Sequence, residues 1–162
     1  MSNLKIKKKS QLQERSVAKD LNAQTVVASG ALWGSKGDVR HDNLLIECKT
    51  TEKSYYSLSM SVWEKIEKEA IKDGLRLPVM CIDIKGGKER YAVFLNKHFN
   101  HYKSYSEIYD GSETSWTDKK SFRIDKPMRV LMISFKNRTG ESPCFIVTPW
   151  DDFLYMIKGG EM

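Results

Sequence analysis

Residues 35–51 constrain the fold most, because they have the pattern of two short strands joined by a tight turn. The Asp42–Asn43 pair separates a segment entering at Val39 from an apolar run at residues 44–46. Asp and Asn are typical turn residues, since their side chains tolerate unusual backbone angles. The sequence therefore predicts a β-hairpin with Asp42 and Asn43 as its two-residue loop.

This loop determines which side chains share a face of the hairpin. Paired residue numbers then sum to 85, so Asp38 is expected opposite Glu47, with Cβ atoms roughly 5 Å apart. Lys49 follows Glu47 by two residues and points to the same face, roughly 7 Å further along. A one-residue slip would break this arrangement. The expected register gathers two carboxylates and one ammonium group on one patch.

Two carboxylates at this distance repel each other unless a cation lies between them. Carboxylate oxygens and water are the ligands that Mg²⁺ and Mn²⁺ prefer. Such an ion can polarise a phosphoryl oxygen and lower the pKa of a bound water, and Lys49 could stabilise developing charge or orient that water. The alternative is that Asp38, Glu47 and Lys49 form the exposed face of an ordinary hairpin, because D…ExK is a short and common pattern.

The composition describes a globular chain of 162 residues, which is the size of one domain with a substantial core. The chain has a net charge of +6, which favours a polyanionic partner without identifying it. Apolar runs are too short to span a membrane, and the basic N-terminus lacks the apolar segment of a signal peptide. The three cysteines are widely spaced, so reduced, buried thiols in a cytoplasmic compartment are expected.

The N-terminal region is expected to hold further site residues. Residues 1–9 are predicted to be a flexible basic tail whose Lys7, Lys8 and Lys9 either contact nucleic acid or are simply solvated. A helix is predicted over residues 10–22, with Glu14 on its inward stripe. Glu14 either pairs with a cation at the edge of that stripe or is a third acid pointing towards the hairpin.

A strand at residues 25–28 leads into a glycine-rich loop at residues 29–37. This loop could approach a phosphate through its backbone N–H groups and the Ser29 hydroxyl, and Lys36 is a further candidate DNA contact within it. The loop lacks the spacing of a Walker A motif.

The remaining pattern alternates short strands and helices. A helix is expected over residues 61–73, with a capping box formed by Ser61 and Glu64 and a stop at Gly74. Strands are expected at residues 79–84, 91–95, 130–135 and 145–148, a polar irregular region at 106–126, and a final helix at 150–157 after Pro149. Lys119, Lys120 and Arg123 form a second basic cluster within the polar region.

Taken together, these residues resemble the PD-(D/E)XK nuclease superfamily, and most closely its archaeal-type and phage Holliday junction resolvases. The resemblance covers about residues 14–84, under half of the chain. It rests on the order of the pieces: a helix with Glu14, a strand ending in ASGA, GDV with Asp38, LLIECK with Glu47 and Lys49, then a helix and an apolar strand. Gly37 replaces the usual proline before Asp38, and nothing after about residue 100 has a counterpart in the minimal resolvase.

The resemblance implies an α/β fold with a restriction-endonuclease-like core. In that core a mixed sheet of about five strands is flanked by helices, and a C-terminal strand-and-helix extension either enlarges the sheet or forms a small second one. Residues 10–100 would be the nuclease core and residues 101–162 the extension, packed on the same domain. Asp38 and Glu47 would bind Mg²⁺, or Mn²⁺ as a substitute, with the main-chain carbonyl of Cys48 as a further ligand.

The resemblance also implies roles for the other residues. Lys49 would act at the attacking water or the scissile phosphate, Glu14 would complete the metal site directly or through water, and Ser29 would lie on a mobile loop near the DNA backbone. The expected function is a metal-dependent endonuclease for branched DNA. It would act in recombination and repair as a homodimer in the cytoplasm of a prokaryote or a phage-infected cell. The alternatives are a restriction-type, trimming or repair nuclease, and a non-catalytic DNA-binding or assembly protein.

Overall fold

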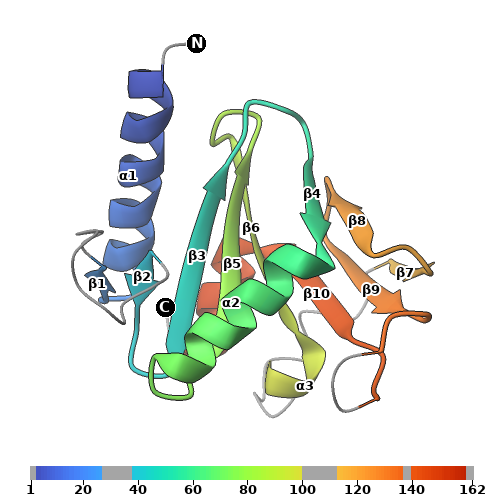
Figure 1. Ribbon diagram of the computed structural model, residues 1–162. Coiled ribbons are helices and arrows are strands. Elements are labelled where there is room, and N and C mark those ends of the chain that lie inside the picture. The colour runs from blue at the N-terminus through green and yellow to red at the C-terminus, as the bar shows by residue number, and fades with distance from the viewer. Residues whose placement is uncertain (1–2, 27–37, 100–112, 137–139, 160–162) are drawn as a thin grey trace.

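The computed structural model describes residues 3–26, 38–99, 113–136 and 140–159. They form a large mixed β-sheet with helices on both faces and a separate two-stranded ribbon (Figure 1). In chain order the elements are α1 (Asn3–Asp20), β1 (Gln24–Thr25), β2 (Val39–Arg40), β3 (Leu44–Thr50), β4 (Tyr56–Ser59), α2 (Met60–Lys72), β5 (Leu77–Ile84), β6 (Glu89–Leu95), α3 (Asn96–Phe99), β7 (Thr114–Thr117), β8 (Ser121–Ile124), β9 (Met128–Met132), β10 (Cys144–Pro149) and α5 (Trp150–Ile157).

The large sheet has eight described strands in the order β1-β2-β3-β5-β6-β10-β9-β7. The β3–β5 and β7–β9 pairs are parallel, and the other neighbours are antiparallel. The predicted α/β class, a mixed sheet flanked by helices with a C-terminal strand-and-helix extension, is confirmed. The sheet is larger than the five strands expected, because β7, β9 and β10 extend it. β8 instead pairs with β4 in the ribbon, so both expected arrangements of the C-terminal strands occur.

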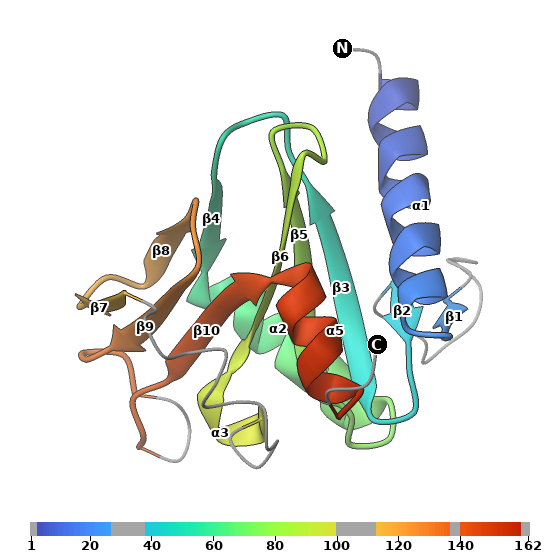
Figure 2. The same cartoon turned by 180° about the vertical axis from the view of Figure 1, so that it is seen from behind.

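Helices cover both faces of the sheet because its central strands are apolar on both sides. In β5, Val79 and Cys81 face a core shared with α1, α3 and α5. Met80 and Ile82 face a second core, which is shared with α2 and the β4–β8 ribbon. A strand buried on both faces loses its alternation of polar and apolar residues, as the LPVMCIDI sequence of β5 does. Figure 2 shows α5 on the face opposite to α2.

Two predicted helix starts are wrong. α1 begins at Asn3 rather than near residue 10, so most of the lysine-rich N-terminus is helical rather than a flexible tail. Lys and Gln have unbranched side chains that lose little freedom in a helix, which allows this extension. α2 begins at Met60, because the Ser59 hydroxyl accepts a hydrogen bond from Val62 N–H at 3.4 Å. The N-cap is therefore Ser59, and the Ser61–Glu64 capping box is not used.

The polar region at residues 106–126 is also more regular than predicted, since it contains β7 and β8. The first strand is shorter than expected, and residues 27 and 28 lie outside the described residues. Cys48 and Cys81 are free and buried, as expected, whereas the free Cys144 is only partly buried. None of the described helices is both long enough and apolar enough to cross a lipid bilayer.

Candidate active site on the β2–β3 hairpin

The hairpin has the predicted register. Val39 pairs with Ile46, and Arg40 pairs with Leu45. His41 and Leu44 exchange backbone hydrogen bonds of 3.0 and 3.3 Å across the turn, so Asp42 and Asn43 are its two loop residues. The strand pairing ends at Val39, and the Asp38 N–H bonds to the Ile46 carbonyl at 3.0 Å, so Asp38 lies beside Ile46 rather than directly opposite Glu47 as predicted.

Strand alternation then separates the site residues from the core. Leu44, Ile46 and Cys48 lie in the core shared with α1 and α5. Glu47 and Lys49 alternate with them and therefore point to the face that α2 covers. Their neighbours in β5 are Met80 and Ile82, which belong to the core under α2. The structure thus places Glu47 and Lys49 on one face, as predicted.

Asp38 contacts the backbone of the same strand. Its Oδ2 accepts a hydrogen bond from Cys48 N–H at 2.7 Å, and its own N–H donates to the Ile46 carbonyl at 3.0 Å. Burial and the Glu47 charge raise the pKa of Asp38 to about 6, against the opposing effect of the hydrogen bond from Cys48. Asp38 and Glu47 are therefore close enough to repel each other.

Lys49 partly balances this negative charge. Its Nζ donates to Glu47 Oε1 at 2.5 Å. Burial alone would lower the pKa of Lys49, but the hydrogen bond to Glu47 and the charges of Glu47, Asp38 and Tyr56 raise it. Lys49 therefore stays protonated beside the two carboxylates. Tyr56, at the start of β4, is an electrostatic neighbour that no local sequence pattern marks.

Helix α1 brings Glu14 to the same region. Glu14 accepts a hydrogen bond from the Ser10 hydroxyl at 3.0 Å, and its charge contributes to raising the pKa of Asp38. The preceding residue, Gln13, is buried and donates through Nε2 to the carbonyls of Lys49 and Cys81 at 3.0 and 3.1 Å. Gln13 therefore attaches α1 to β3 and β5 beside the site. Sequence reasoning missed it, because no local pattern marks a glutamine that bonds to a distant backbone.

The donor chemistry of this site fits a divalent cation. Asp38 and Glu47 offer hard carboxylate oxygens, and the pKa of Asp38 is raised first by burial and then by the Glu47 charge. Within the described ranges, no three His, Cys, Asp or Glu residues cluster closely enough to hold a metal ion together. Asp38 and Glu47 are the two side chains here that could hold a cation.

The candidate DNA contacts are only partly described. Ser29, Lys36 and the side chain of Lys7 lie outside the described residues. Lys8 and Lys9 are exposed on α1, and Lys9 forms an ion pair with Glu52 in the loop between β3 and β4. In both views α1 and the β4–β8 ribbon lie on opposite sides of β3 (Figures 1 and 2).

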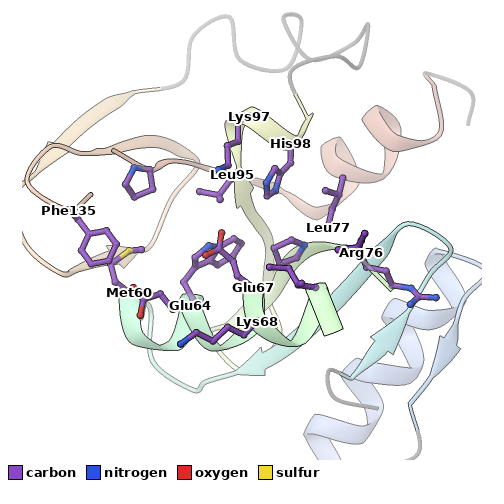
Figure 3. Close-up of a pocket in the computed structure, with 15 residues that line it drawn as sticks. Met60, Glu64, Glu67, Lys68, Arg76, Leu77, Leu95, Lys97, His98 and Phe135 are labelled. Atoms are coloured by element: carbon purple, nitrogen blue, oxygen red, sulfur yellow. The ribbon is translucent and has the colours of Figure 1, made fainter. Parts of the chain in front are cut away.

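A pocket of about 360 Å³ lies away from these residues, over α2 and α3. Figure 3 shows Met60, Leu95, His98 and Phe135 around it. Asp38, Glu47 and Lys49 do not line it, and its lining is a mixture of apolar and charged side chains. The carboxylate site on the hairpin is thus separate from this pocket.

Comparison with known proteins gives one solved structure to report. No family model matches the chain, and no curated protein matches it. The solved structure is that of Hjc, a Holliday junction resolvase from the archaeal hyperthermophile Archaeoglobus fulgidus, with a TM-score of 0.43 and 19% sequence identity. The match covers 70% of this chain and 84% of that one.

Proposed function

We propose that this chain is a metal-dependent endonuclease that hydrolyses phosphodiester bonds in branched DNA. The proximity of Asp38, Glu47 and Lys49 carries the proposal, because Lys49 bonds to Glu47 and the charges of both act on Asp38. The order of Glu14, Asp38, Glu47 and Lys49 along the chain, which resembles that of PD-(D/E)XK nucleases, supports the same conclusion.

Each site residue has a role in this proposal. Asp38 and Glu47 hold Mg²⁺, or Mn²⁺ in its place, with the Cys48 carbonyl as a further ligand. A bound divalent cation supplies charge stabilisation at the phosphate and lowers the pKa of a bound water. Lys49, kept protonated by Glu47, stabilises the negative charge that develops on the scissile phosphate. Glu14 orients water at the edge of the site.

The substrate and the assembly are also part of the proposal. A four-way junction has near two-fold symmetry, so a symmetric homodimer would present two such sites to two strands. The net charge of +6 favours association with a nucleic acid. We place this activity in DNA recombination and repair in the cytoplasm.

The test is cleavage of a labelled four-way junction beside a linear duplex of the same arm sequence, in Mg²⁺, Mn²⁺ or EDTA. We expect paired cuts near the branch that need the metal and fall by about 100-fold or more in Asp38→Asn. Asp42→Asn is the matched control, since it removes an exposed carboxylate from the tip of the same hairpin. Equal cutting of the duplex would contradict the junction preference, and binding of both DNAs without cutting would indicate a non-catalytic DNA-binding protein.

A further inference from the structure

We propose that the outward face of the β4–β8 ribbon, with the adjoining turn, binds the DNA strand that leads away from the active site. This inference rests on the proposed function and names a surface in the C-terminal part of the chain that the nuclease resemblance does not cover. Phosphates would contact Arg123, Lys119 and Lys120.

The ribbon has one buried and one exposed face. Leu58, Phe122 and Ile124 point into the core under α2. The alternate residues Ser57, Ser121 and Arg123 are exposed, with Ser57 directly opposite Arg123. The buried side fixes the ribbon on the sheet, so the exposed side is a firmly held surface of hydroxyl and guanidinium groups, all of which can donate to phosphate oxygens.

A cation–π contact orders the arginine on this surface. The Arg123 guanidinium carbon lies 4.0 Å from the Tyr55 ring centroid, and Lys53 Nζ lies 5.6 Å from the same centroid. Arg123 Nε also bonds to Asp125 at 3.0 Å, in a pair that is exposed on both sides. Exposed pairs of this kind contribute little free energy, so a phosphate can compete with Asp125 for the guanidinium.

The turn between β7 and β8 adds two further cations. Lys119 and Lys120 are exposed, and no ion pair to either is found among the described residues. Trp116 of β7 is also exposed, but it pairs with Leu131 and therefore points to the opposite face of the sheet, outside this surface. The turn thus adds two ammonium groups that can contact phosphates next to Arg123.

The ribbon adjoins the candidate active site. Tyr56 of β4 follows Tyr55 directly, and it interacts electrostatically with Lys49 and Glu47. In both views the ribbon lies on the side of β3 away from α1, beyond β5 and β6 (Figures 1 and 2). A strand whose phosphate lies at Lys49 would therefore reach Arg123 by crossing β4, and β7 lies further along the same direction. The turn that carries Lys119 and Lys120 therefore extends the candidate active site and is not a remote patch.

The test measures binding without catalysis. Fluorescence anisotropy of labelled single-stranded, duplex and four-way junction DNA would be recorded in EDTA at several salt concentrations. The variant carries Lys119→Gln, Lys120→Gln and Arg123→Gln. The control carries Lys72→Gln, Lys88→Gln and Lys158→Gln, which removes the same charge from exposed sites elsewhere. A version with only Lys119→Gln and Lys120→Gln leaves the Tyr55–Arg123 contact intact, in case the full variant folds poorly.

We expect the ribbon variant to bind DNA about tenfold or more weakly than the wild type. The slope of log K against log salt should fall in magnitude by about 2 to 3, because each lost phosphate contact lowers that slope by about 0.7 to 0.9. The control should keep the slope of the wild type. Equal losses in the ribbon and control variants, or wild-type binding by the ribbon variant, would overturn the inference.

Cleavage in Mg²⁺ by wild type and Asp38→Asn distinguishes this inference from the proposed function. Ribbon-dependent binding without any Asp38-dependent cleavage would contradict the nuclease and support the binding surface. Asp38-dependent cleavage by a ribbon variant that binds like the wild type would support the nuclease and contradict the binding surface.

Discussion

At the residue scale, the charged Asp38 side chain of the candidate site lowers the free energy of unfolding. Its carboxylate is partly buried and faces the Glu47 charge, and the Cys48 N–H offsets this penalty only in part. Active sites commonly keep such perturbed groups, because catalysis and ligand binding need charge that folding alone would avoid. The charged form of Asp38 thus lowers the stability of the folded chain.

This penalty predicts a pH-dependent gain of stability in Asp38→Asn. The folded-state pKa of Asp38 is about 6, above its ordinary value of 3.8, so the folded state holds the proton more tightly. The stability linked to this group is therefore complete below pH 4 and lost as the pH rises through 6. In EDTA, Asp38→Asn should gain about 1–2 kcal/mol at pH 7.5, after allowance for its partial exposure, and little at pH 4. Urea denaturation at both pH values measures this, and a gain of equal size at both would contradict it.

Lys49 leads to a second prediction, because its ammonium group bonds to the Glu47 carboxylate when no metal is bound. The 2.5 Å contact between Lys49 Nζ and Glu47 Oε1 competes with a cation for the same oxygen. Lys49→Met should therefore bind Mn²⁺ about three- to tenfold more tightly, given about 1 kcal/mol for a half-exposed pair, while cleaving DNA more slowly. Calorimetric titration with Mn²⁺ at pH 7.5 checks this. Lys53→Met, which is exposed in the following loop, is the control, and unchanged or weaker binding in Lys49→Met would show that the pair does not compete.

The pairing of β2 with β3 could be predicted from the sequence, because a two-residue turn fixes the residue pairs next to it, although not the position of Asp38 one residue further on. Asp42 and Asn43 defined the turn, so the placement of Glu47 and Lys49 followed from the alternation of a strand. Gln13 and Tyr56 could not be found in this way. Their places depend on how α1 and β4 pack on the sheet, and this is decided by contacts between residues distant in sequence.

At the element scale, α1 is held by a polar network as well as by its apolar stripe. Arg90 of β6 donates to Asp83 at 2.6 and 2.9 Å and to the Ser16 hydroxyl at 3.0 Å. Its guanidinium also lies 3.5 Å from Asp20, which accepts a hydrogen bond from Trp150 Nε1 at 2.9 Å. The network therefore joins α1 to β5, β6 and α5, and it helps to fix the helix that carries Glu14.

Breaking this network should be costly. Arg90→Met leaves the buried Asp83 carboxylate without its bidentate partner, and we expect a loss of about 3 kcal/mol in the free energy of unfolding. Adding Asp83→Leu should recover part of the loss, because an apolar side chain needs no partner there. Urea denaturation of the single and double variants measures the coupling. Lys85→Met, in an exposed pair with Glu89, is the control, and strictly additive effects of the Arg90 and Asp83 changes would argue against the network.

The elements missed in the sequence share a physical cause. β7 and β8 are four-residue strands with polar alternate positions, so they lack an apolar run. β8 is stabilised by pairing with β4, which is more than 60 residues earlier in the chain. The buried strands β5 and β10 were predictable because their sequences are themselves apolar. Short, half-exposed strands are stabilised by pairing with other strands, and the local sequence does not show which strands those are.

At the scale of the whole molecule, the C-terminal part completes the sheet. β10 pairs with β6 on one side and with β9 on the other, and α5 covers the core that also contains α1. Phe153 of α5 contacts Phe94 and Phe99 with ring centroids 5.4 and 5.8 Å apart. The part that resembles a nuclease thus shares its apolar core with residues far outside it.

This shared core predicts that the first 99 residues do not fold alone. A chain ending at Phe99 would expose the apolar edge of β6, leave β4 without β8, and remove the α5 side of the core. We expect it to lack cooperative thermal unfolding and to aggregate, which circular dichroism and size-exclusion chromatography would detect. In the full chain, Phe153→Ala should cost about 3–5 kcal/mol, and Tyr155→Ala, partly exposed on the same helix, should cost much less. A cooperatively folded fragment, or a small effect of Phe153→Ala, would show that the first 99 residues form an independent unit.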